Sequence, residues 1–398
     1  MASVVDTSVK NFNSTMSGAP ALSGTAGTLI ALLDAVLVNG FDVKTASGLT
    51  VAGGVASLPF TGAHSAQLDS VISISGITGT YASLNGEQKV TAVGAGVVRF
   101  ATNLPDGTAS GTISFKMAPA GWEKVASASG KATYRSLDPM STKAILRVDD
   151  TAAQTVRVIG YESMTDIDTG IGPFPTSTQM SGGGYWAKST AANSTPNPWA
   201  VHADSRIFYF TVLPGFQAGP TVTNGVTRCF GDFAALRPGG DAYACGLSYS
   251  STNVASSQTD GGVGSPGNIA QFAFPRSHTG LGSSALYYKF AYPGIAAPSG
   301  IVASAGSFPS EVDGTLIVEK QYVSLGTTAA PRANFPGVYH SCQSLVWDSF
   351  KFLDVAPGAD SLAGRTLHAM TCTNTTFGGA AVSSSTGVLW IDRTGPWR

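Results

Sequence analysis

Acidic residues gather in one stretch of a chain that is otherwise poor in charge. Residues 145–170 contain four aspartates and one glutamate, whereas charged residues make up 12% of the whole sequence. Carboxylates at this density can bind a divalent metal ion or act in general acid–base catalysis. The segment DIDTG, residues 166–170, resembles the start of a calcium-binding loop, but the distal glutamate of such a loop is missing. Asp166 and Asp168 are therefore weak metal candidates, and we predict no metal ion or other cofactor.

The pattern around these acids favours a β-hairpin over a metal or catalytic site. Residues 145–150 and 155–164 alternate in side-chain character, and the short polar segment TAAQ joins them. Asp149 and Asp150 are then turn residues whose carboxylates accept hydrogen bonds from nearby backbone N–H groups. Arg147 and Arg157 would lie on the paired strands, where the aspartates compensate their charge.

Histidines and cysteines offer no recognisable cluster. The five histidines are far apart in the sequence: His64, His202, His278, His340 and His368. The four cysteines form no Cys-x-x-Cys pair: Cys229, Cys245, Cys342 and Cys372. We predict isolated surface or hydrogen-bonded histidines and buried thiols, with a disulfide as the alternative for the cysteines.

Motifs of the common enzyme classes are also missing. The chain has no Gly-x-Ser-x-Gly elbow and no phosphate-binding loop, and the segment SGGGY lacks the lysine of such a loop. An enzyme that cuts a cell-wall or capsule polymer needs a carboxylate pair or a metal site, and no pair has a diagnostic context. We therefore predict that the protein is not an enzyme.

Aromatic residues beside glycine and asparagine form a second candidate site. Tyr185 and Trp186 follow three glycines, and Trp199 lies in the segment NPW. Aromatic rings fill β cores and subunit interfaces, and exposed rings in such settings can stack on sugars. Core or interface positions are favoured, and glycan contact through these three residues is the alternative.

One helix is predicted near the start of the chain. In residues 23–41 the apolar side chains recur with helical spacing at 29, 32, 33, 36 and 37. Ser23 or Thr25 is the candidate N-cap, and Asn39-Gly40 marks the end. The apolar face would pack on the chain's own sheet, or alternatively form a surface for a partner.

The rest of the chain is typical of β-structure. Residues 46–117 contain short strands separated by turn signals, and we predict a small β-sandwich or barrel inserted into a loop. Residues 1–45 would supply an N-terminal arm and the helix, and residues 118–398 a β-rich main domain of sandwich or jelly-roll type. A polar segment rich in glycine and serine at 251–283 is predicted to be an exposed loop. Residues 1–22 are predicted to form an arm that orders only against a neighbouring subunit.

The overall charge limits the possible partners. The net charge is −1, so the chain has no basic field for nucleic acid or acidic membranes. The longest apolar run has ten residues, whereas a membrane span needs about 20. The first residues lack the basic and apolar regions of a signal peptide. A charge-poor surface suits subunits that cover one another, so we expect a homo-oligomer without membrane insertion.

Several segments resemble poorly characterised structural proteins, associated with the tail or neck, of tailed bacteriophages and prophages. They include VDTSVKNFNSTMSGAPALSGTAGTLIALLDAVLVNGF, PAGWEKVASASGKATYRS, LRVDDTAAQTVRVIGYESMTDIDTGIGPFPT, GGGYWAKS, DSRIFYF and FGDFAALRPGGDAY. These patches cover the first 45 residues and most of 118–245. The segments LNGEQKVTAV and DGTASGTI are similar to small β modules of tail and fibre proteins.

The resemblance implies a virion component that is cytoplasmic in the host during assembly, and it supplies no catalytic residues. We therefore expect a structural protein of the tail, neck or capsid, present in symmetric copies beside other phage structural proteins. The alternative is a fibre module that binds a host-surface polysaccharide or receptor.

Overall fold

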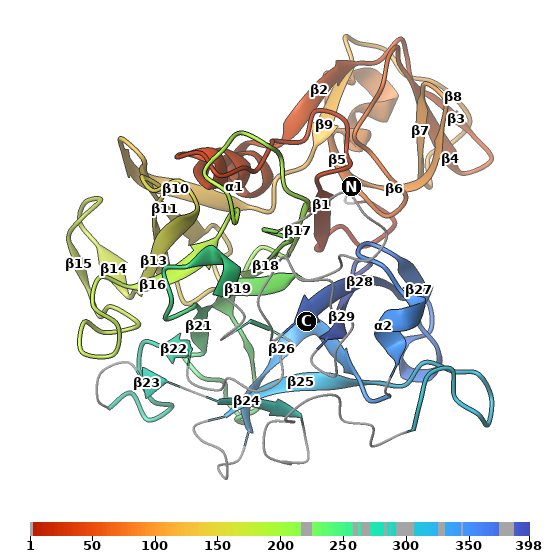
Figure 1. The fold of residues 1–398 in the computed structure, drawn as a ribbon. Coiled ribbons are helices and arrows are strands. Elements are labelled where there is room, and N and C mark those ends of the chain that lie inside the picture. Colours follow the sequence, from red (N-terminus) through yellow and green to blue (C-terminus); the bar gives the residue numbers. More distant parts are fainter. Residues whose placement is uncertain are drawn as a thin grey trace.

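The computed structural model describes residues 3–215, 225–257, 262–263, 271–281, 285–286, 288–291, 306–324, 331–343, 345–373 and 386–398. Within them the chain is mainly β, as predicted, and every strand pairing is antiparallel (Figure 1). None of the described helices is long and apolar enough to cross a membrane. Of the loop predicted at 251–283, residues 258–261, 264–270 and 282–283 lie outside the described residues. The exposed-loop prediction is wrong for Phe272–Phe274, because these residues form a buried strand, β22.

A central sheet contains the N-terminal strand beside strands from the middle of the chain. Its order is β1 (Lys10–Asn13), β17 (Trp199–Ala203), β18 (Ile207–Val212), β19 (Val226–Asp232), β21 (Cys245–Ser248), β22 (Phe272–Phe274) and β23 (Ala285–Leu286). The second sheet is a meander of β10 (Trp122–Ala128), β11 (Lys131–Ser136), β12 (Ile145–Asp149), β13 (Thr155–Tyr161) and β16 (Gly184–Ala187). The two-stranded ribbon of β14 (Ser163–Met164) and β15 (Gly170–Ile171) extends from the second sheet.

The C-terminal part forms a third sheet. Its order is β24 (Tyr288–Ala291), β25 (Val318–Ser324), β26 (Pro331–Ser341), β29 (Thr386–Asp392), β28 (Thr366–Thr373) and β27 (Val355–Pro357), and β20 (Ala234–Ala235) also pairs with β26. Short helical turns accompany the sheets: η3 (Ala255–Ser257), α2 (Val346–Ser349) and η4 (Asp360–Leu362).

The three sheets stack as layers. Phe208 and Phe210 of β18 face a core shared with Leu146 of the second sheet. Ile207 and Tyr209, on the opposite face of β18, enter a core shared with the C-terminal sheet. Because the central sheet is buried on both faces, the strands β17, β18 and β19 are buried at every position instead of at alternate ones. The predicted mainly β, sandwich-like fold is thereby confirmed.

Residues 41–117 form a sheet of their own (Figure 1). Its order is β2 (Phe41–Thr45), β9 (Ser114–Met117), β5 (Val71–Ser75), β6 (Gly86–Gly94), β7 (Val97–Ala101), β4 (Val55–Pro59), β3 (Thr50–Ala52) and β8 (Gly107–Thr108), with η2 (Gly79–Leu84) between β5 and β6. A bridge between Ala46 and Phe60 brings the end of β2 back to β4, so the sheet nearly closes into a barrel. The Ala120 N–H donates to the Val36 carbonyl at 2.9 Å, which places entry and exit of this segment side by side. That residues 46–117 are an inserted module stays a prediction.

The predicted helix is shorter than expected. Its α-helical part, α1, spans Thr28–Leu33 and continues as a π-helical turn, η1 (Asp34–Asn39), which ends at Gly40 with φ +70°. The residue before the helix is Gly27, so Ser23 and Thr25 are not its N-cap. All five apolar side chains predicted for one face are buried in the core between the sheets. Packing on the chain's own sheets is therefore confirmed.

The N-terminal residues are not a free arm. β1 pairs with β17 along its full length, from Lys10 opposite Ala203 to Asn13 opposite Ala200. Phe12 is 1% exposed, so the prediction that residues 1–22 order only against a neighbour is wrong. The reason is that the few apolar residues of this segment are well spaced, and Val9, Phe12, Met16 and Leu22 are all buried.

Candidate functional site

Two of the three aromatic residues proposed for glycan contact lie in the core. Trp186 and Trp199 are both fully buried. The Trp186 indole N–H donates to the Ser248 carbonyl at 2.6 Å, and that of Trp199 donates to the Pro20 carbonyl at 3.0 Å. Burial with satisfied N–H groups leaves no ring face for a sugar, so glycan contact through these tryptophans is wrong.

Tyr185 is partly exposed but already has a partner. The guanidinium of Arg157 lies 4.0 Å from the centre of the Tyr185 ring, in a cation–π contact on the surface of the second sheet. Because Trp186 and Trp199 are buried, Tyr185 does not form an aromatic platform with them.

The acidic stretch forms the predicted hairpin, and its two adjacent aspartates have different roles. β12 and β13 pair with Asp149 opposite Arg157, which confirms the hairpin. Charge compensation is confirmed for Arg147, which lies 3.6 Å from Asp149. Asp149 accepts a hydrogen bond from the hydroxyl of Thr151, as expected of a turn residue. Asp150 instead points into the core, where it is fully buried.

Asp150 caps the distant helix α1. Its Oδ2 accepts hydrogen bonds from the N–H groups of Leu29 (2.8 Å) and Ile30 (3.1 Å). Its Oδ1 pairs with the ammonium of Lys188, which is also fully buried and donates to the carbonyls of Thr25 and Ala152. Burial raises the pKa of Asp150 and lowers that of Lys188, while their mutual attraction opposes both shifts. The expectation that Asp150 bonds to nearby backbone is therefore wrong.

Asp166 and Asp168 are occupied by protein groups. Asp166 accepts hydrogen bonds from the N–H groups of Asp168 and Thr169, each at 2.8 Å, in a local turn. Asp168 pairs with Lys131 at 2.9 Å and Arg147 at 2.6 Å, and these cations lower the pKa of its carboxyl. The two aspartates thus hold the β14–β15 ribbon against the second sheet.

Two histidines predicted to be isolated meet in the core. His202 on β17 and His368 on β28 are 2.8 Å apart, and Arg393 lies 2.7 Å from the other nitrogen of His368. Arg393 also lies 3.3 Å from Asp69, which belongs to the nearly closed sheet of residues 41–117. The prediction of isolated histidines is wrong for this pair, because the stacking of two sheets brings β17 and β28 together.

The cysteine prediction is confirmed where the structure describes the thiols. The side chains of Cys229, Cys245 and Cys342 are buried thiols. The side chain of Cys372 lies outside the described residues. Burial raises the pKa of the Cys342 thiol to about 12, with a further contribution from the nearby Glu319 carboxylate.

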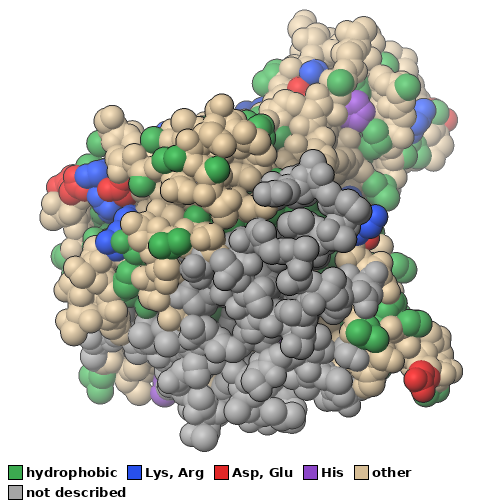
Figure 2. Space-filling model, viewed as in Figure 1, with side chains coloured by type: hydrophobic (Ala, Val, Ile, Leu, Met, Phe, Trp, Pro, Cys, Tyr) green, Lys and Arg blue, Asp and Glu red, His purple; other side chains and the backbone are tan. Residues whose placement is uncertain are grey.

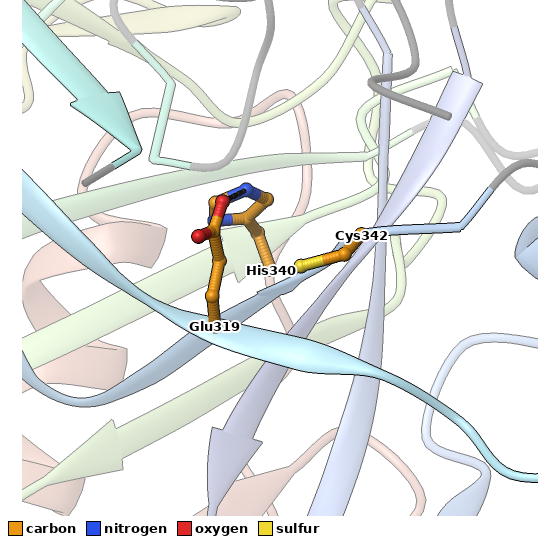
Figure 3. A group of neighbouring side chains, drawn as sticks. All are labelled: Glu319, His340 and Cys342. Carbon is orange, nitrogen blue, oxygen red and sulfur yellow. Dashed lines mark ion pairs between the residues drawn. The ribbon is translucent and has the colours of Figure 1, made fainter. Parts of the chain in front are cut away.

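The strongest chemical grouping among the described residues consists of Glu319, His340 and Cys342, hereafter the β25–β26 triad (Figure 3). The Nε2 atom of His340 lies 2.7 Å from Oε1 of Glu319. One ligand atom from each of the three residues lies within 4.8 Å of the other two. The site is partly open, because the Glu319 and His340 side chains are 32% and 16% exposed while Cys342 is buried.

The triad was missed in the sequence because His-x-Cys is not a familiar motif. Residues two apart on a β-strand share a face, so His340 and Cys342 on and just after β26 converge without any helical or Cys-x-x-Cys spacing. Glu319 joins them because it is the cross-strand partner of His340. An imidazole, a thiol and a carboxylate can together bind a transition metal. As a nucleophile the thiol is poorly suited, because its raised pKa keeps it protonated at neutral pH.

A polar hollow lies on the other face of the same strands. Its volume is about 430 Å³. It is lined among others by Lys320, Tyr339, Arg365, Asp392 and Trp397. Since Lys320 and Tyr339 are direct cross-strand partners, their side chains share this face, opposite the one carrying the triad. The hollow and the triad are thus two separate features.

Comparison with known proteins found no matching family model and no matching curated sequence. Inferences about function therefore rest on the geometry described above and on the resemblance of individual sequence segments.

Proposed function

We propose that the chain is a structural protein of a tailed-phage particle, a peripheral component of the tail, neck or capsid that assembles in symmetric copies. The observation that carries the proposal is the placement of charge. Scarce ionisable side chains are used inside the fold to fasten one layer to the next, which suits a rigid scaffold.

Three buried or half-buried ion pairs illustrate this use. Lys188 and Asp150 fasten the second sheet to α1. Arg332 of β26 makes two contacts with Asp241, at 2.7 and 3.1 Å, and so ties the C-terminal sheet to the connection between β20 and β21.

The C-terminal residue makes the third of these connections. Arg398 lies 2.9 Å from Asp204 at the end of β17 and donates to the carbonyl of Asp232 on β19. The chain end is thereby fixed against the central sheet. Removing one partner of such buried pairs is costly, so they hold the layers in one arrangement.

The surface is consistent with a subunit of an assembly. On the face shown in Figure 2, basic and acidic side chains form small mixed groups instead of one large patch of a single sign. The net charge of −1 gives little electrostatic repulsion between copies. A surface of this kind favours association with identical neighbours.

The test is the mass of the purified protein in solution, together with immunodetection in purified particles. We expect a defined ring or closed oligomer and a stoichiometric signal in particles. A strictly monomeric protein that is absent from particles would overturn the proposal.

A second candidate function is host-surface binding, and the polar hollow on the C-terminal sheet is the observation that favours it. Tyr339 and Trp397 offer aromatic surface, and Lys320 offers a cationic group that suits an acidic sugar, whereas Arg365 pairs with Asp392 at 3.1 Å. The same mass measurement with host polysaccharide tests it. Binding that is lost on Lys320→Ala but kept on Lys351→Ala, an exposed position outside the hollow, would support this function.

A further inference from the structure

The β25–β26 triad has the geometry of a metal site built on two strands. His340 and Cys342 are separated by one residue, and the backbone of both continues the ladder with the neighbouring strand. Glu319 lies directly opposite His340. Cross-strand partners and i, i+2 residues project to one face of a sheet, so the three side chains meet above the same pair of strands (Figure 3).

We propose that Glu319, His340 and Cys342 bind one zinc-class transition-metal ion, with the fourth coordination position open. Cys342 releases its thiol proton to water when the ion binds, as cysteine ligands do. The resulting thiolate and the imidazole select zinc and related ions over calcium and magnesium, which require oxygen ligands. Three protein ligands with a free position are typical of zinc sites that exchange a water or a substrate. This inference is independent of the proposed virion role.

The distances are close to those that a tetrahedral ion needs. Zinc bonds of about 2.0–2.3 Å place neighbouring ligand atoms about 3.3–3.7 Å apart. The Glu319–His340 contact of 2.7 Å is shorter than this, and the outer limit of 4.8 Å for the group is longer. Side-chain rotations that move the ligand atoms by about 1 Å would bring all three to zinc-bonding distances, with the backbone in place.

The backbone around the triad is fixed by other contacts. The Cys342 N–H donates to the Ile317 carbonyl at 3.0 Å. The next residue, Gln343, is buried, accepts a hydrogen bond from the Ile317 N–H at 2.8 Å, and donates to the carbonyls of Ser307 and Thr315, each at 3.2 Å. Gln343 thus holds the strand that presents Cys342, as outer partners do in metal sites.

The experiment uses the full-length chain after removal of metal with a chelator. Titration with zinc should give one bound ion per chain, and cobalt(II) should give the absorption of a thiolate-to-metal charge transfer. We expect Cys342→Ser to abolish that absorption. Each of Cys342→Ser, His340→Asn and Glu319→Gln should weaken zinc binding at least tenfold, since even the loss of an outer partner costs about 10- to 100-fold.

Matched controls separate the triad from general binding. His278→Asn and Glu311→Gln change the same residue types at exposed positions and should leave zinc affinity unchanged. Zinc should raise the unfolding temperature of the wild type and of both controls, but not that of Cys342→Ser, because an ion that binds only the folded state stabilises it.

Three results would overturn the proposal. They are an absence of zinc binding at micromolar concentration, cobalt binding without the sulfur absorption, and equal zinc affinity in Cys342→Ser and the wild type. A triad variant that fails to fold would be replaced by the wild type treated with a thiol-alkylating reagent. Zinc bound beforehand should then slow alkylation of Cys342, and equal rates with and without zinc would also contradict the site.

Discussion

The Nε2 atom of His202 lies 2.8 Å from Nδ1 of His368, and this contact joins the central sheet to the C-terminal sheet. His368 accepts a hydrogen bond at Nε2 from Arg393, which can only donate. A neutral His368 therefore carries its proton on Nδ1 and donates it to His202. Burial lowers the pKa of His202 to about 3 and that of His368 well below its ordinary value, with Arg393 acting in the same direction on both.

The first prediction concerns acid stability. The folded-state pKa of His202 is lowered. Below about pH 6.5, His202 is therefore protonated in the unfolded chain but stays neutral in the folded chain. Stability is therefore lost as pH falls from 6.5 towards 3, by about 1.4 kcal/mol per pH unit for this histidine. His202→Gln should lower the unfolding free energy at pH 7.5 by about 1–3 kcal/mol. In the variant, the unfolding free energy should also fall less steeply with decreasing pH, by about 1.4 kcal/mol per pH unit.

Urea unfolding at several pH values between 7.5 and 4.5 measures this. His278→Gln, at an exposed position, is the control for the change of residue type. Parallel pH profiles for the wild type and His202→Gln would show that His202 is not buried in its neutral form.

The second prediction contrasts two adjacent aspartates. Asp150→Ala leaves the buried ammonium of Lys188 without its carboxylate and removes the cap from Leu29 and Ile30. We expect a loss of about 3–5 kcal/mol in unfolding free energy, as for other broken buried pairs. Asp149→Ala, at the end of β12 where the side chain is partly exposed, should cost less than about 1 kcal/mol.

Urea unfolding of both variants at neutral pH checks this contrast, and the double variant Asp150→Leu with Lys188→Met adds a second test. Replacing both charges by apolar groups should recover much of the loss, because no unpaired charge remains. Equal stability of the two aspartate variants would contradict the buried position of Asp150.

The sheets were predictable from the sequence, but the contacts between them were not. Alternation and turn residues identify the 145–164 hairpin, because strand pairing between neighbours is a local property. The start of α1 depends on Asp150, more than 100 residues away, so the polar residues at 23 and 25 indicated an N-cap that is not used. The meeting of His202 with His368 likewise follows from the stacking of sheets, which no local pattern encodes.

The candidate sites show the same limit. Glycine beside Trp186 left glycan contact as an alternative to a core position, yet at Gly184 the side chain of Tyr249 occupies the space that a Cβ would need. The glycine is there for close packing, and it accompanies a buried ring. The sequence shows only a histidine and a cysteine two residues apart, and the glutamate of the triad comes from another strand whose register the sequence does not give.

The third prediction tests the core position of Trp186. Trp186→Ala removes a fully buried ring and leaves the Ser248 carbonyl without its donor, so we expect a loss of about 3–5 kcal/mol. Tyr185→Ala, one residue earlier and partly exposed, should cost less than about 1.5 kcal/mol. Unfolding by urea, followed by circular dichroism, compares the two. A stable Trp186→Ala protein with reduced polysaccharide binding would restore the glycan hypothesis.

The fourth prediction decides between an N-terminal arm and an integral strand. Phe12 lies on β1 and is 1% exposed. Two other residues of β1 contact residues 41–117: Lys10 pairs with Glu87 at 2.8 Å, and Asn11 donates to the Asp69 carbonyl at 3.1 Å. Phe12→Ala should therefore lower the unfolding free energy of the dissociated chain by about 3–5 kcal/mol. Val4→Ala, at a position 47% exposed, should change it by less than about 0.5 kcal/mol. An arm that orders only on a neighbour would make no contribution to the dissociated chain. Equal urea midpoints for Phe12→Ala and the wild type at low protein concentration would therefore contradict the integral strand, whereas a large loss in Phe12→Ala alone would establish it.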